Sequence, residues 1–187
     1  MIVEVLFSTL DGGGRPNFAP MGVVWGEEEI VVRPFRATHT FANLLANGYG
    51  VANVTDDALA FVEAALGDPL LPCFPAVRVP GVVFQGACYW RELEVTDVAG
   101  NDERAEIACR VVHRGWRRDF LGFSRARNAL VELAILATRL HLSGVEPVLE
   151  ALERYEAIVR KTGDEPERKA LTLIQNYVER WKHGRPG

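Results

Sequence analysis

The chain has 187 residues, of which 48% are hydrophobic and 25% are charged, and its 21 basic and 25 acidic residues leave a net charge of −4. This is the composition of a globular protein that is long enough to bury a core without disulfides or metal ions. The negative net charge argues against broad binding to nucleic acids or to anionic membranes.

The first residues of the chain indicate its compartment, and the spacing of the cysteines excludes some kinds of site. The opening residues MIVEVLFSTL lack the charged start of a signal peptide, and no apolar run reaches the ~18 residues of a transmembrane helix. We therefore expect a cytoplasmic protein. Cys73, Cys88 and Cys109 are far apart and form no C-x-x-C pair, so they predict neither a metal site nor a disulfide framework. Cys88 and Cys109 lie in apolar runs and should behave as small hydrophobes.

The first part of the chain is rich in predicted strands. Apolar stretches with β-branched and aromatic residues predict strands over residues 3–9, 19–26 and 27–35. The connections between them are short, and the first, residues 11–17, is rich in glycine. Three successive strands with short turns indicate an antiparallel meander, which is the start of a barrel or a sandwich.

Two short helices and one more strand follow. Thr38 or Thr40 can cap a helix whose apolar face is formed by Phe41, Leu44 and Leu45, with Gly48 as its end. A strand is expected over residues 49–55. Asp56 is the expected cap of a second helix, which has Leu59, Val62 and Leu66 on one face and ends at Gly67.

Two long strands complete the β-rich part. Residues 67–81 contain four prolines and are expected to form a structured loop without helix or central strand. Strands are predicted over residues 86–97 and 103–114, joined by the turn AGND. In the first of them, Tyr89, Arg91, Leu93 and Val95 alternate with polar or amphipathic residues, which is typical of a strand with one buried face.

The rest of the chain predicts three helices. Ser124 caps the first, which should run to just before Gly144. The second runs from about residue 146 to Gly163, and the third opens with a capping box of Asp164 and Glu167. We therefore expect two parts, a barrel over residues 1–120 and a helical extension over residues 121–187.

The stretch IVVRPFRATHTFANL, residues 30–44, is the first candidate site. Alternation places Arg33 on one face of a strand that leads into the start of a helix, where free N–H groups bind anions. Thr38 and Thr40 add hydroxyl groups, and arginine adds a fork that suits phosphate. The stretch is either a phosphate cradle or a capped helix with solvated arginines. Arg36 points away from Arg33 by alternation and is expected in solvent.

The second candidate is RPNFAPMGV, residues 15–23. Here Asn17, Pro20, Met21 and Gly22 combine an amide, a rigid kink, a soft side chain and bare backbone. A planar ring could lie against such a strand and be bound by main-chain groups. The alternative is a hairpin with a methionine in the core.

The third candidate is the start of the helix after Ser124. Arg125, Arg127 and Asn128 lie in its first turn, where cations oppose the helix dipole and therefore suggest an anionic partner. Glu132 and Arg139, two turns apart, are charges in an otherwise apolar helix. These residues either pair with other parts of the protein or contact a ligand.

The remaining motifs exclude several classes of protein. His39, His113, His141 and His183 are dispersed without metal-ligand spacing, so no metal site is expected, and His39 alone lies within a candidate site. The chain has no G-x-G-x-x-G, no P-loop and no G-x-S-x-G motif. Rossmann, P-loop and serine-hydrolase interpretations therefore have no support, and the catalytic residues stay unassigned.

Taken together, these stretches resemble a known family. VEVLFSTLDGGGRPNFAPMGVVW, then IVVRPFRATHTFANLLANGYGVANVTDD, then FSRARNALVELAILATRLHL and the late KTGDEPERKAL are similar to an uncharacterised branch of the FMN-binding split-barrel proteins. This group is related to flavin reductases and to pyridoxamine-phosphate-oxidase-like proteins. The chain lacks the more basic phosphate-binding run of the pyridoxamine-phosphate oxidases, so the resemblance does not extend to their substrate.

The resemblance implies a mainly β fold with helices: a six-stranded split β-barrel, a C-terminal three-helix extension, and a homodimer that binds FMN at the subunit interface. The implied cofactor-binding residues are Arg33, Thr38 and Thr40 at the phosphate, Asn17, Pro20, Met21 and Gly22 along the flavin ring, and Asn53 on the flanking strand.

We therefore expect a flavoprotein, and three functional hypotheses follow. The first is an FMN-dependent oxidoreductase that passes reducing equivalents to a small substrate. The second is a non-catalytic carrier or sensor that binds FMN or another ligand, and the third is a dimeric interaction module with an empty pocket. In the first case the flavin carries the redox chemistry, which fits a sequence without an evident catalytic triad.

Overall fold

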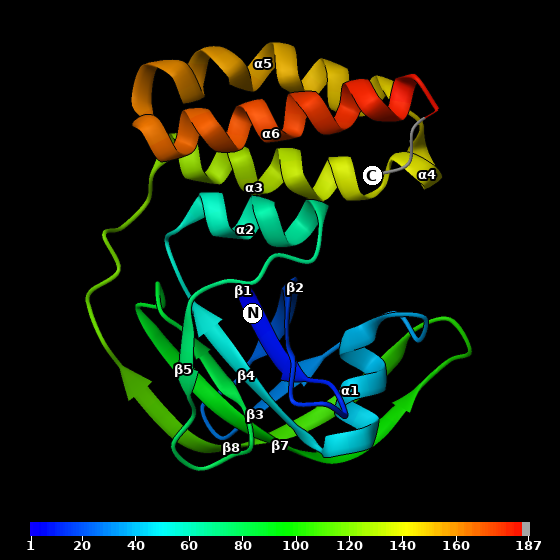
Figure 1. The fold of residues 1–187 in the computed structure, drawn as a ribbon, viewed down its shortest axis with the longest axis vertical. Helices are drawn as coiled ribbons and strands as arrows, with labels where there is room; N and C mark the ends of the chain where they lie inside the picture. The colour runs from blue at the N-terminus through cyan, green and yellow to red at the C-terminus, as the bar shows by residue number, and fades with distance from the viewer. Residues whose placement is uncertain (185–187) are drawn as a thin grey trace. The chain divides into compact units, whose positions relative to one another are not determined.

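Six antiparallel strands close into a barrel in the computed structural model, which describes residues 1–184 (Figure 1). The strands are β1 (Ile2–Leu10), β2 (Pro16–Trp25), β3 (Glu29–Val32), β4 (Tyr49–Val54), β7 (Tyr89–Gly100) and β8 (Ala105–Trp116). They follow one another in the order β1, β2, β3, β8, β7, β4, and β4 pairs back with β1. The meander of the first three strands and the six-stranded barrel expected from the sequence are both confirmed.

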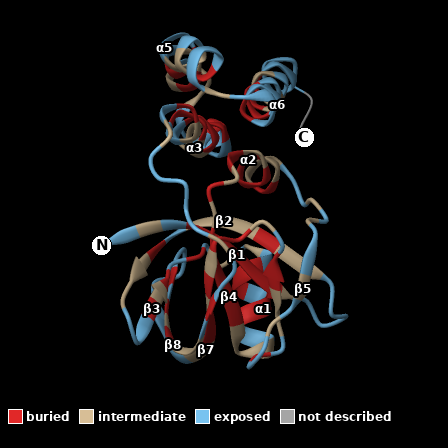
Figure 2. Ribbon diagram, turned by 90° about the vertical axis from the view of Figure 1, so that its left-hand side faces the viewer, coloured by how far each residue is buried: buried red, intermediate tan, exposed pale blue. Residues whose placement is uncertain are grey.

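Buried residues lie along the strands of the barrel (Figure 2), and apolar side chains that alternate along these strands pack in its interior. Phe7, Ile30, Leu93 and Ile107 have no exposed surface. Cys109 belongs to the same core, and burial, assisted by the charge of nearby Glu29, raises the pKa of its thiol to about 12. The thiol therefore stays protonated and packs as a small hydrophobe, as its apolar neighbours in the sequence predict.

The outer face of β1 and β4 is buried as well, because the short hairpin of β5 (Cys73–Pro75) and β6 (Val82–Phe84) covers it. Ser8 Oγ, on that face, donates a hydrogen bond of 2.6 Å to the carbonyl of Val82. Residues 67–81 were expected to contain neither a helix nor a central strand, and Cys73–Pro75 is a strand of a two-stranded sheet in which no strand is central. Strand β5 pairs only with β6, so the neighbouring prolines interrupt no further ladder.

Strand β7 also differs from the sequence prediction of a single buried face. Trp90 and Glu92, which lie on the face away from the barrel core, are both buried. The Glu92 carboxylate accepts hydrogen bonds from the backbone N–H groups of Val77 (2.8 Å), Arg78 (2.6 Å) and Val79 (3.3 Å). Glu92, which strand alternation would place in solvent, thus holds the loop between β5 and β6 in position.

Helix α1 (His39–Asn47) follows β3 and packs on β1 and β2. Its N-cap is Thr38, whose Oγ1 accepts the N–H of Phe41 at 3.3 Å, and its C-cap is Gly48 in the left-handed region at φ 74°. Phe41 and Leu44 are buried, as the pattern predicts. Leu45 is 55% exposed and does not belong to the apolar face.

The helices other than α1 form a second compact unit. They are α2 (Ala58–Leu66), α3 (Arg125–Thr138), α4 (Leu140–Ser143), α5 (Glu146–Thr162) and α6 (Glu165–Lys182). The unit comprises Asp56–Pro69 and the residues from Leu121 onward, while Met1–Thr55 and Leu70–Phe120 form the barrel unit. Helix α2 therefore packs with the C-terminal helices although it lies between two strands in the sequence, and Leu130, Leu133 and Ile174 are fully buried in their common core.

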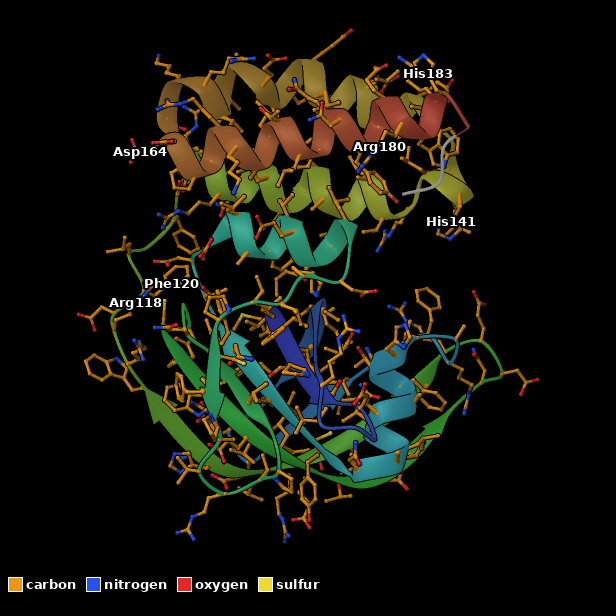
Figure 3. All side chains as sticks on the ribbon, viewed as in Figure 1. Arg118, Phe120, His141, Asp164, Arg180 and His183 are labelled. Atoms are coloured by element: carbon orange, nitrogen blue, oxygen red, sulfur yellow. The ribbon has the colours of Figure 1, made fainter. Side chains whose placement is uncertain are left out.

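Capping residues set the helix boundaries in this unit. Ser124 Oγ accepts the N–H of Arg127 at 3.4 Å, as predicted. Asp164 and Glu167 form the expected capping box at the start of α6, and the C-cap at its other end is His183 (Figure 3). The cap of α2 is Asp57 rather than Asp56. None of the helices between residues 1 and 184 is long and apolar enough to cross a membrane.

Candidate functional site

A cluster of polar side chains lies where β1 and β2 meet the first turn of α1. Asn17 Nδ2 donates to Thr40 Oγ1 at 3.2 Å and to Thr9 Oγ1 at 3.4 Å. Asn43 Nδ2 donates to Thr9 Oγ1 at 3.0 Å. Thr9, Thr40 and Asn43 are buried, whereas Asn17 is partly exposed. The cluster fixes Asn17 and Thr40 beside the start of the helix.

The first turn of α1 offers hydrogen-bond donors. The first N–H groups of a helix have no partner within it, and they coincide with the positive end of the helix dipole. Thr38 Oγ1 accepts one of them, that of Phe41, which leaves the N–H groups of His39 and Thr40. No acidic residue occupies this first turn. The side chain of His39, the first residue of the helix, is exposed.

The two arginines before α1 occupy different environments. Arg33 is exposed, and its Nε lies 2.8 Å from Glu106 Oε2 in an ion pair whose members are both about half exposed. Arg36 is half-buried: its Nε donates to the Asn101 carbonyl at 2.6 Å, and its guanidinium carbon lies 5.1 Å from the centre of the Phe41 ring. The expectation that Arg36 lies in solvent is wrong. Strand β3 ends at Val32, so strand alternation does not extend to residue 36.

The second candidate segment lies in β2 and is divided between the two faces of that strand. Met21 is paired with Val5 and packs on the barrel core. Pro20 and Gly22 lie on the opposite face. A Cβ at Gly22 would come within 2.8 Å of Glu4 Oε1, so glycine leaves room there for a neighbouring side chain. Within this segment, Asn17 forms a hydrogen bond to the start of α1, at Thr40.

Asn53, on β4, is fully buried, and its amide is used within the barrel unit. Its Nδ2 donates to the Leu6 carbonyl at 2.9 Å and to Ser8 Oγ at 3.1 Å, and its Oδ1 accepts the N–H of Phe84 at 3.0 Å. These contacts hold β6 against β1 and β4. The structure therefore brings together Asn17, Thr38 and Thr40, and it places Arg33, Met21 and Asn53 in other contacts.

Three residues near α1 were not identified from the sequence: Thr9, Asn43 and Arg36. A signal existed for the first two. Thr9 continues the inward-facing alternation of β1 as a polar residue, and Asn43 lies three residues after Thr40 on the buried side of a short helix. A polar side chain at a core position is the informative exception to apolar patterning.

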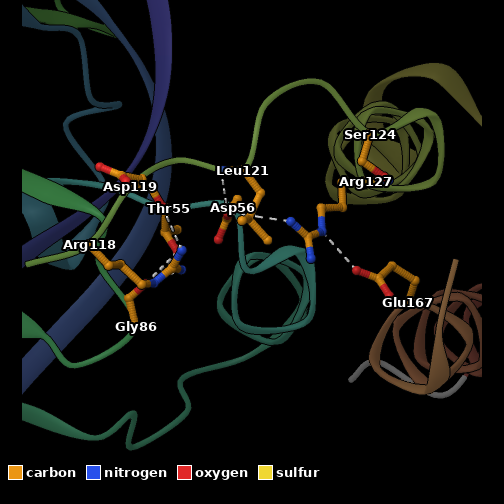
Figure 4. Close-up of polar contacts among 9 residues, drawn as sticks. All are labelled: Thr55, Asp56, Gly86, Arg118, Asp119, Leu121, Ser124, Arg127 and Glu167. Atoms are coloured by element: carbon orange, nitrogen blue, oxygen red, sulfur yellow. Dashed lines mark hydrogen bonds and ion pairs between the residues drawn. The ribbon is translucent and has the colours of Figure 1, made fainter.

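The third candidate, at the start of α3, forms an internal ion-pair network. Arg127 Nε lies 2.8 Å from Glu167 Oε1, and its Nη1 lies 3.4 Å from Asp56 Oδ2, which also accepts the N–H of Leu121 at 3.1 Å (Figure 4). Burial, the largest single influence, raises the pKa of Glu167. Hydrogen bonds from Arg127 and from the backbone N–H groups of Asp164 and Glu167 outweigh it, so that pKa lies below its usual value.

For Arg127 the pairing interpretation therefore holds. The side chains of Arg125 and Asn128 point to solvent, and Glu132 and Arg139 form no ion pair within residues 1–184. In the same part of the chain, no three His, Cys, Asp or Glu side chains are grouped so that they could hold a metal ion. The donors around α1 are thus the arrangement that best suits a ligand, and their chemistry suits an anion.

The closed barrel and the helix that starts beside it define a split β-barrel protein. The chain belongs to the family described as "Protein of unknown function (DUF447)". The model of the family's N-terminal domain matches residues 3–118, and a second model with the same description matches residues 124–176.

Three proteins of similar sequence or fold are informative. An FMN-bound protein from Methanosarcina mazei, described with the same family, has a crystal structure that superposes with a TM-score of 0.79, at 29% identity over 94% of both chains. An uncharacterized protein from Methanocaldococcus jannaschii is 24% identical over 93% of this chain and 96% of its own length. A putative flavin reductase with a split barrel domain from Shewanella frigidimarina, at 10% identity and a TM-score of 0.56, covers 64% of this chain and 69% of its own, and it shares the fold.

Proposed function

We propose that this protein binds FMN, with the phosphate at the first turn of α1, and that it is an oxidoreductase which passes reducing equivalents to a small substrate. The observation that carries the proposal is the similarity, at 29% identity over 94% of both chains, to a protein of the same family that is FMN-bound.

The residues around α1 fit the phosphate end of FMN. Two backbone N–H groups at the positive end of the helix suit a dianion. The hydroxyl of Thr38 already donates to the Phe35 carbonyl at 2.7 Å, so Thr38 serves the site chiefly by capping the helix. Thr40, whose hydroxyl accepts a hydrogen bond from Asn17, and an arginine that precedes the helix add further donors. The first turn of α1 contains no acidic residue that would repel the phosphate.

The flavin ring would lie along the β2 segment. Pro20 and Gly22 share one face of this strand and present little side-chain bulk to a planar ring. Met21 would support the segment from the barrel interior, and Asn53 would support it indirectly by holding β6 in place. In this proposal the ring meets backbone and small side chains at Pro20 and Gly22, and the Glu4 side chain, which lies beside Gly22, borders it.

FMN supplies the redox chemistry when it is bound, so the protein must bind it, orient it and limit the access of water. The buried hydroxyl and amide groups of Thr9, Thr40 and Asn43 are already paired with one another or with Asn17. Such a network holds its members in place before the ligand arrives, which reduces the cost of ordering them on binding.

We also propose a homodimer with the FMN site at the subunit interface, as the family resemblance implies. The barrel unit has several exposed large apolar side chains, and Trp116 (67%) and Val77 (64%) are among them. A second copy of the chain would remove such surface from water. Sedimentation at micromolar concentration tests this part alone: a single species with the mass of one chain would contradict it.

The function is tested in two steps. Flavin-free protein is first titrated with FMN, and we expect saturable quenching of flavin fluorescence; no quenching would favour an interaction module without a flavin. NADH or NADPH is then added to the flavin-bound protein without oxygen, and loss of the visible flavin absorbance is expected for an oxidoreductase. If FMN binds but neither nucleotide bleaches it, the protein is better described as a flavin carrier or sensor.

A further inference from the structure

We infer that Arg36, and not Arg33, is the side chain that recognises the phosphate of FMN and thereby makes the site select FMN over riboflavin. The inference rests on the proposed function, because it assigns a role within the same site. It follows from how each arginine is held and from what each guanidinium already contacts.

The position of Arg36 is fixed by the tip of the hairpin between β7 and β8. Its backbone N–H donates to the Glu103 carbonyl at 3.0 Å, and its Nε donates to the Asn101 carbonyl at 2.6 Å. Asn101 is itself fixed, because its Oδ1 accepts the N–H groups of Glu103 (3.0 Å) and Arg104 (2.7 Å). The guanidinium therefore loses little conformational freedom when a ligand binds.

The guanidinium of Arg36 lies beside the first turn of α1. Its guanidinium carbon lies 5.1 Å from the centre of the Phe41 ring, and Phe41 is the third residue of α1. The Asn101 carbonyl accepts from Nε, which leaves the two terminal nitrogens of the guanidinium. Within the described chain Arg36 forms no ion pair. A cation that is positioned but not neutralised next to a helix N-terminus complements a phosphate.

Arg33 lacks these properties. Its Nε is paired with Glu106 at 2.8 Å, and a phosphate would have to compete with that carboxylate. Arg33 also lies five residues before the N-cap Thr38, whereas Arg36 lies two residues before it. The charge of Arg33 is therefore balanced locally, and the charge of Arg36 is not.

The two flavins separate a phosphate contact from a structural role. FMN and riboflavin share the ring and the ribityl chain, and only FMN carries the phosphate. A residue that contacts the phosphate should affect the affinity for FMN and leave the affinity for riboflavin unchanged. A residue that merely supports the fold of the site should weaken the binding of both.

The test compares Arg36→Met with the matched variant Arg33→Met, which also retains an unbranched stem and loses a guanidinium from the same segment. Dissociation constants for FMN and riboflavin are measured by fluorescence quenching on flavin-free protein. We expect Arg36→Met to weaken FMN binding by about tenfold or more, because a charge-assisted hydrogen bond is lost. Its riboflavin affinity should stay within about twofold, and Arg33→Met should change neither constant by more than that.

The outcomes are distinct. A larger loss of FMN affinity in Arg33→Met than in Arg36→Met would overturn the inference, as would equal losses for FMN and riboflavin in Arg36→Met. In both cases the wild-type protein still binds FMN and the proposed function stands. Failure of the wild-type protein to bind either flavin would overturn the proposed function and the assignment of Arg36 with it.

Discussion

Replacing Arg127 with methionine should destabilise the helical unit strongly. Arg127 pairs with both Asp56 and Glu167, whose side chains are 4% and 8% exposed. Methionine keeps most of the apolar stem and removes the charge. The substitution therefore removes the cation that two nearly buried carboxylates, at the starts of α2 and α6, share.

The size of the effect follows from the burial of the three groups. Removing one partner of a buried ion pair costs about 3–5 kcal/mol, because the other charge stays desolvated. The Arg127 side chain is 28% exposed, so water already screens part of the interaction. Asp56 keeps the N–H of Leu121, and Glu167 keeps that of Asp164. We therefore expect a loss of about 2–3 kcal/mol in the free energy of unfolding.

Urea denaturation at neutral pH, followed by far-ultraviolet circular dichroism, measures this loss. Arg125→Met is the matched control, because Arg125 lies two residues earlier in α3 and is exposed to solvent. Surface substitutions of this kind usually change stability by no more than about 0.5 kcal/mol. If the two variants have the same stability, the network does not stabilise the unit and the reasoning is refuted.

Three further predictions concern other parts of the molecule. The lowered pKa of Glu167 means that its carboxylate contributes stability above the unfolded value, near 4.5, and that this stability is lost as the pH falls through the folded pKa. The free energy of unfolding of Glu167→Gln should therefore depend less on pH in the acidic range than that of the wild type. Parallel plots of this free energy against pH for the two proteins would contradict the prediction. Glu92→Gln should cost about 1.5–3 kcal/mol and speed hydrogen exchange at residues 77–79, because three backbone N–H groups lose a charged acceptor; unchanged exchange would refute the role. Thr9→Val should weaken FMN binding several-fold, whereas Thr9→Ser should bind FMN like the wild type, because the hydroxyl accepts hydrogen bonds from Asn17 and Asn43. Equal FMN affinities of Thr9→Val and the wild type in a titration would exclude this role.

Local sequence signals predicted most of the elements because each was decided by nearby residues. The stop at Gly48 and the capping box at Asp164 lie where the pattern placed them, and the cap at Thr38 is one of the two threonines that the pattern offered. The packing partner of α2 was not predictable in this way. Its apolar face indicates only that it must be buried, and the structure packs it with helices more than fifty residues later in the chain.

The candidate site was predicted less completely, for reasons that particular residues make clear. Alternation assigned Arg33 and Arg36 to opposite faces of a strand that ends before either residue is reached. The family resemblance assigned Asn53 to the strand that flanks the site, and its amide forms hydrogen bonds with residues of β1 and β6. Side-chain partners that are far apart in the sequence, such as Arg33 and Glu106, leave no local pattern.

The visible absorbance spectrum of the purified protein tests the central claim most directly, since oxidised flavin absorbs where the protein does not. We predict that the protein, as isolated or after incubation with FMN and removal of the excess, shows the bands of oxidised flavin. Denaturation should then release FMN in an amount close to that of the protein chains. A colourless protein after the same incubation would contradict the account.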